Sequence, residues 1–142
     1  MDDRYIIPKL TMALAIVMAL VGIGRQINKL NNLITPLTTQ IIMEEYINQK
    51  VIVRADRAGV FFGTLIRKEG NEVELKDCRR LWYWRGAASI SEIAVNGVKN
   101  PRDCKFTVPV KSITILGVIE IIPCEEKAIK CIESVPVWKI SD

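Results

Sequence analysis

Three arginines and three large aromatic side chains fall within residues 79–86 of this 142-residue chain. If this segment is a strand, its side chains alternate between two faces, so that Arg80, Trp82 and Trp84 share one face and Arg79 lies on the other. A guanidinium beside an indole can bind an anion and stack a planar ring together. This chemistry suits a nucleotide. The alternative is a buried strand whose tryptophans belong to the core and whose arginines reach out at its rim.

The surrounding sequence is basic, although the net charge of the whole chain is only +4. Residues 50–111 hold thirteen basic and seven acidic side chains, whereas residues 1–49 are neutral and residues 112–142 are slightly acidic. Most of the aromatic side chains lie in the same basic section. An anionic ligand with flat rings is therefore expected to bind there.

The composition argues against an enzyme. The chain has no histidine, which is the usual general base near neutral pH, and no nucleophile or phosphate-loop motif. Its cysteines form no C-x-x-C pair, so neither a metal centre nor a cofactor is expected. They are read as free thiols, and no cleavable signal peptide is recognised, which predicts a cytoplasmic protein. The four cysteines are Cys78, Cys104, Cys124 and Cys131.

Residues 1–49 are predicted to form a helical oligomerisation segment. A first helix is expected over residues 5–34, and Thr35-Pro36 marks the start of a second helix that ends near Ile47. Residues 10–23 are apolar on almost every side but short for a membrane span. Apolar residues at alternating steps of three and four continue from Ile16 to Ile41, past that run and into polar sequence. This pattern favours an oligomer core, and a short membrane anchor stays the alternative.

Residues 50–142 are predicted to form a β-rich ligand-binding domain. The fold class is α+β, in which the N-terminal oligomerising helices precede a small curved antiparallel β-sheet or partial barrel with short helices. Ser89 and Glu92 have the spacing of a capping box and predict a helix from Ile90 to about Val95. A last helix is expected over residues 125–132. The expected strands are residues 50–55, 60–67, 72–76, 79–84, 106–110, 113–116, 118–123 and 135–140.

Several stretches between residues 50 and 124 resemble a known family, and the most specific of them is residues 78–87. The family is the first-described type of phage anti-Thoeris signal sponge. The resemblance implies a non-enzymatic protein that captures cyclic ADP-ribose isomers made by TIR immune enzymes in an infected bacterial host. It also implies a homo-oligomer, with a hexamer favoured, and in some members a second site for cyclic oligonucleotides of the CBASS pathway. The other stretches are residues 51–54, 58–63, 96–98 and 119–124.

Such a ligand carries a diphosphate and an adenine, and each needs its own partners. The diphosphate calls for arginine, and a stacking face for the adenine would come from a tryptophan or from Phe61. A bidentate contact to the adenine edge would come from Asn96 or Asn100. Arg102 and Lys105, on the loop of residues 99–105, are candidates for a cyclic trinucleotide. The candidate arginines are Arg57, Arg79, Arg80 and Arg85, and the candidate tryptophans are Trp82 and Trp84.

Two other classes of function share these features. A nucleic-acid-binding phage regulator would use the same basic and aromatic side chains, but over many phosphates. A membrane-associated accessory protein would use residues 10–23 as its anchor. Polymeric nucleic acid and membrane are the less favoured partners.

Overall fold

The computed structural model describes residues 29–34 and 44–141. The chain divides into two units, residues 1–42 and 43–142, and the second contains every strand presented here. Residues 29–34 are helical, and residues 44–49 form a short helical piece that ends in a turn. The other parts of the expected oligomerisation segment, residues 1–28 and 35–43, which include residues 10–23 and Pro36, lie outside the described residues. Within the described ranges, no helix combines the length and apolar character that a bilayer crossing requires.

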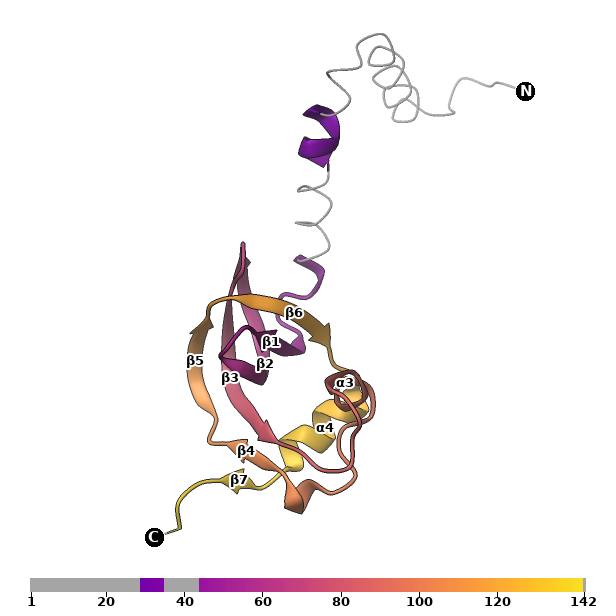
Figure 1. The fold of residues 1–142 in the computed structure, drawn as a ribbon, viewed down its shortest axis with the longest axis vertical. Coiled ribbons are helices and arrows are strands. Elements are labelled where there is room, and N and C mark those ends of the chain that lie inside the picture. Colours follow the sequence, from indigo (N-terminus) through magenta and orange to yellow (C-terminus); the bar gives the residue numbers. More distant parts are fainter. Residues whose placement is uncertain (1–28, 35–43, 142) are drawn as a thin grey trace, which may run out of the picture. The chain divides into compact units, whose positions relative to one another are not determined.

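Five antiparallel strands form the centre of the second unit (Figure 1). The hairpin turn after β1 contains Arg57, which has a positive φ of 60°. The last of these strands pairs with the first, and the strands lie in the order β6-β1-β2-β3, with β5 paired to the other edge of β3. These strands are β1 (Lys50–Ala55), β2 (Gly59–Glu69), β3 (Glu72–Tyr83), β5 (Val110–Ile115) and β6 (Val118–Pro123).

One long strand, β3, replaces the two strands expected at residues 72–76 and 79–84. The chain stays paired through Asp77, whose positive φ of 48° produces an irregularity in the register instead of a turn. Such a bulge bends the strand, so its first half pairs with β5 and its last residues pair with β4 (Lys105–Thr107). Figure 1 shows β3 curving accordingly. The break expected between residues 76 and 79 is therefore absent.

The sheet is open and mixed, not wholly antiparallel as expected. Its seventh strand, β7 (Val137–Trp138), runs parallel to β4 and forms the outer edge of the sheet. An edge strand containing Trp138 was predicted correctly, but its bounds were too wide. The direction of β7 follows from α4 (Glu126–Ser134), which carries the chain across one face of the sheet before β7 begins.

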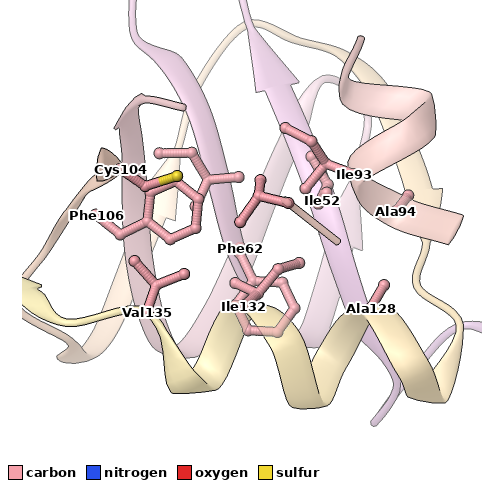
Figure 2. Packing of buried hydrophobic residues seen from close by; sticks show 11 residues of the cluster. Ile52, Phe62, Ile93, Ala94, Cys104, Phe106, Ala128, Ile132 and Val135 are labelled. Carbon is pink, nitrogen blue, oxygen red and sulfur yellow. The ribbon is translucent and has the colours of Figure 1, made fainter. Parts of the chain in front are cut away.

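The helices cover one face of the sheet and enclose its main core (Figure 2). The helix α3 (Ile90–Asn96) begins as the capping box predicts, because the Ser89 hydroxyl accepts from the Glu92 backbone and the Glu92 carboxylate accepts from the Ala88 N–H. Ile52 and Phe62 contribute the sheet side of this core. The opposite face of the sheet packs around a second cluster that contains Phe61, Leu75 and Cys78, among others.

Candidate functional site

Arg79 and Arg80 point to opposite faces of β3, as strand alternation predicts. In the register of β2 and β3, Arg79 lies opposite Phe62 of the helix-covered core, and Arg80 lies opposite Phe61 of the second cluster. The two neighbouring arginines therefore meet different surroundings. One is buried and fully hydrogen-bonded, while the other borders an open groove.

The Arg79 side chain is a structural element, which corrects its assignment as a ligand-binding residue. It is 7% exposed, burial lowers its pKa, and its guanidinium donates to five different backbone carbonyls at 2.9–3.2 Å. A guanidinium has five N–H donors, so none is left for a phosphate. These bonds join β3 to β4 and to the end of α4. The accepting carbonyls belong to Phe106, Thr107, Ile132, Val135 and Pro136.

Arg80 borders a groove of about 410 Å³ together with Arg57 and part of β5. Its guanidinium carbon lies 4.8 Å from the centre of the Phe61 ring. Phe61 is only 2% exposed and its face is covered by this guanidinium, so it offers no free surface for stacking a base. The structure thus brings Arg57, Phe61 and Arg80 together in one groove, which Asp56 also lines and which offers no free aromatic face.

Trp82 is not among the residues that line this groove, and it stacks on Trp138 of β7. The ring centres are 6.3 Å apart and the planes differ by 19°. The Lys105 ammonium lies 5.4 Å from the centre of the Trp138 ring, so a cation adjoins this pair of indoles. Trp82 is 62% exposed, and the pair presents an aromatic surface to solvent. Sequence reasoning placed Trp138 only in an edge strand, because its partner is 56 residues away in the chain.

Two further candidates are placed apart from these surfaces. Trp84 follows the end of β3 and packs against the helix-covered core, so it does not share the face of Trp82 as expected. Asn96 ends α3, and its side-chain oxygen accepts from the Lys127 ammonium at 3.3 Å. Trp84 is therefore a packing residue, and Asn96 is joined to α4.

Arg85, Asn100 and Arg102 line a basic hollow of about 590 Å³. Lys99 adds a third cation, and Asp103 is the one carboxylate that lines it. Arg85 forms an ion pair with Asp103 at 3.3 Å, which leaves the positive charge in excess. Ser134 and Pro136 complete the wall. Sequence reasoning treated Lys99 only as part of a cationic loop, because nothing in the local pattern shows that the loop folds back on residues 85–86.

Hydrogen bonds hold the backbone around this hollow in place. Lys99 N–H donates to the Gly86 carbonyl at 3.1 Å, and Asn100 N–H donates to the Arg85 carbonyl at 3.4 Å, so the two segments lie side by side. The Cys104 thiol accepts from the Arg85 N–H and donates to the Asn100 carbonyl. Gly86 has a φ of 88°, which favours glycine, and an added Cβ would lie 2.7 Å from the Lys99 Cβ. The loop is therefore held in a defined shape before any ligand binds.

Three of the four cysteine thiols, those of Cys78, Cys104 and Cys124, are poorly suited to nucleophilic chemistry. Burial raises the pKa of Cys78 and of Cys124 to about 12, and burial also raises the pKa of Cys104. A thiol with a raised pKa is protonated at neutral pH and is a weak nucleophile. Within the described residues, no group of three or more cysteine or acidic side chains is arranged to hold a metal ion.

Comparison with known proteins assigns the chain to a family. The model of a domain of unknown function, DUF6948, matches residues 48–132. The chain belongs to the DUF6948 family. No curated protein matches it. The DUF6948 match extends from just before β1 into α4. It includes the Arg80 groove and the five polar or charged residues of the hollow between residues 85 and 103, but not Ser134, Pro136 or Trp138.

Proposed function

We propose that this DUF6948 protein binds a cyclic nucleotide immune signal of the cyclic ADP-ribose class and sequesters it without chemical change. The observation that carries this proposal is the basic hollow, where three cations and one amide surround a volume of about 590 Å³. Ligand sites commonly measure about 300–1,000 Å³. The ligand class comes from the sequence resemblance to the anti-Thoeris sponges, and the hollow offers the charge that such a ligand needs.

In this proposal, Arg102 and Lys99 bind the diphosphate, and Arg85 contributes its remaining donors while Asp103 fixes its direction. A guanidinium can contact phosphate oxygens with two parallel N–H groups, whereas an ammonium acts as a point charge. Asn100 is the candidate for the adenine edge, because an amide can both donate to N7 and accept from N6. The supporting loop is already ordered by its backbone bonds, which reduces the entropy lost on binding.

The base still needs a stacking face, and no aromatic side chain lines the hollow. The exposed indole pair of Trp82 and Trp138 is not part of the wall of the hollow. We therefore include in the proposal a homo-oligomer, with a hexamer favoured, in which a neighbouring copy closes the ligand site. Tight capture in the cytoplasm of an infected host would require such a closed site, since an open surface rarely excludes enough water.

Titration calorimetry with a cyclic ADP-ribose isomer tests the assigned site. Arg102→Ala and Lys99→Ala should each weaken binding by about tenfold or more, since a charge-assisted hydrogen bond contributes about 1.5–3 kcal/mol. Lys130→Ala is the matched control, because Lys130 is an exposed cation on α4 that pairs with Glu126. Wild-type affinity in both hollow variants would contradict the assignment.

The nucleic-acid regulator is the second candidate, and the exposed tryptophan pair beside Lys105 is the observation that favours it. Bases of a single strand can stack on such a surface. The salt dependence separates the two functions, because a small cyclic ligand has few phosphates and a strand engages many. A steep salt dependence with an oligonucleotide, together with no binding of the cyclic ligand, would favour the regulator.

A further inference from the structure

A small cavity lies beside β3, at the point where this strand changes partners. β3 pairs with β5 as far as Cys78 and with β4 from Leu81, and residues 108–109 join the two partner strands without pairing. The apolar walls of the cavity are formed by Phe61, Cys78, Val108, Val110 and Ile113. Its volume is about 170 Å³. Because an apolar cavity of about 150 Å³ can hold benzene, this cavity has room for one phenyl ring.

Two polar residues complete the lining, and only Arg80 has a side chain without a hydrogen-bond partner. The Thr107 hydroxyl accepts from the Arg80 backbone N–H at 2.9 Å and donates to the Val108 carbonyl at 3.4 Å. The Arg80 guanidinium forms no hydrogen bond or ion pair with any other described residue, and its one close contact is the Phe61 ring. All five of its N–H donors are therefore available to a ligand.

The charge of Arg80 is not neutralised by the acidic groups around it. Of the described residues that line the adjoining groove, Asp56 is the one with a carboxylate, and it pairs with Arg57 at 3.8 Å. The Cys78 thiol also borders the cavity, but burial raises its pKa to about 12, so it is uncharged at neutral pH. The groove and the cavity adjoin, because Phe61 and Arg80 line both. An unpaired positive charge therefore stands where the open groove meets the small apolar cavity.

We propose that this cavity and Arg80 form a binding site for a small carboxylic acid whose apolar part is about the size of a phenyl ring. The ring enters the cavity, and the carboxylate accepts two parallel N–H bonds from the guanidinium. A carboxylate fits better than a phosphate monoester, because one guanidinium neutralises its single charge, whereas the monoester carries about −1.5 to −2 charges at pH 7. Mostly apolar walls with one well-placed charged group are typical of small-molecule sites.

This inference goes beyond the proposed function and does not depend on it. Among the described residues, none lines both this cavity and the basic hollow. The two sites also differ in chemistry, since the hollow is bordered by several cations and the cavity is mainly apolar. Binding of a carboxylic acid and binding of a cyclic nucleotide can therefore fail separately.

Saturation-transfer NMR on the full chain, with phenylacetate as the probe, tests the ligand class because it detects weak binding. We expect phenylacetate to bind and phenylacetamide, which has the same shape but no charge, to bind at least about tenfold more weakly. Acetate should also bind more weakly, because it leaves the apolar cavity unfilled. Equal binding of the acid and the amide, or tighter binding of phenyl phosphate, would overturn the carboxylate assignment. Absence of phenylacetate binding would overturn the site.

Two variants locate the ligand. Arg80→Met removes the guanidinium but keeps a long side chain over Phe61, and should weaken phenylacetate binding by about tenfold or more. Val110→Phe fills the cavity from its 40% exposed side and should abolish binding. Arg54→Met is the matched control, because the Arg54 guanidinium already pairs with Glu120 at 2.8 Å, and it should bind phenylacetate as the wild type does. Wild-type affinity in a folded Arg80→Met or Val110→Phe variant would overturn the proposed site.

Discussion

Replacement of Arg79 by alanine should destabilise the protein strongly, although its neighbour Arg80 can be replaced at little cost. The Arg79 guanidinium donates to five backbone carbonyls from β4, from the last turn of α4 and from the chain between α4 and β7. Without it, these segments lose the group that joins them to β3. Arg80 donates no hydrogen bond from its side chain in the described part of the chain, and it is half-buried over a phenylalanine ring.

The expected magnitude follows from the carbonyls that water cannot reach. Three of the five bonds are buried, those to Phe106, Ile132 and Val135, and two are partly buried. A buried acceptor left without a donor costs about 1–3 kcal/mol, so Arg79→Ala should lower the free energy of unfolding by at least about 3 kcal/mol. This is a large part of a typical domain stability of about 5–15 kcal/mol.

Urea unfolding followed by tryptophan fluorescence measures this effect. Arg80→Ala is the control and should change the free energy of unfolding by less than about 1 kcal/mol, as is usual for a partly exposed side chain. Arg79→Lys keeps the charge but supplies three donors in place of five, so its stability should lie between those of the alanine variant and the wild type. Equal, small effects at both positions would refute the structural role of Arg79.

Three further predictions concern side chains around the two surfaces. Trp84→Ala should lower stability by about 2 kcal/mol or more because the indole packs against the core, while the exposed Trp82→Ala should cost less than about 1 kcal/mol in urea unfolding. Gly86→Ala should lower the melting temperature and weaken the binding of any ligand in the hollow. The added Cβ would collide with Lys99 on the opposite segment, and the backbone φ of 88° is strained for alanine. Cys78 and Cys124 should resist iodoacetamide at pH 8, since burial raises their pKa to about 12. Above about pH 9 the folded protein keeps two thiol protons that the unfolded chain releases. The contribution of the two cysteines to stability is therefore fully present below that pH and is lost as the pH rises towards 12. The loss is at most about 1.4 kcal/mol per cysteine and pH unit.

Local sequence patterns predicted the elements but not their partners. The capping box at Ser89 located α3, and the alternation in residues 50–55 located β1, because both signals depend on neighbours within a few residues. The parallel pairing of β7 with β4 depends on where α4 delivers the chain, which no local pattern records. The bulge at Asp77 was missed for a similar reason, since the pairing on both sides of β3 keeps that strand continuous.

The candidate site shows the same division. Alternation correctly placed Arg79 and Arg80 on opposite faces, but it could not tell which face the helices cover. Because Arg79 faces the helix-covered core, its guanidinium bonds to backbone carbonyls and is not available to a phosphate. The pairing of Trp82 with Trp138, and the folding of Lys99 against residues 85–86, join segments that are distant or separated by a helix. Such contacts are fixed by the tertiary structure and not by spacing.

The release of intact ligand tests the central claim most directly. The full chain is mixed with the product of an active TIR enzyme, separated from free nucleotide and heated, and the released material is analysed by mass spectrometry. A sequestering protein removes the signal while folded and returns the cyclic ADP-ribose isomer with unchanged mass after denaturation. A released nucleotide of altered mass would indicate an enzyme, and the absence of any retained nucleotide would contradict the proposed function.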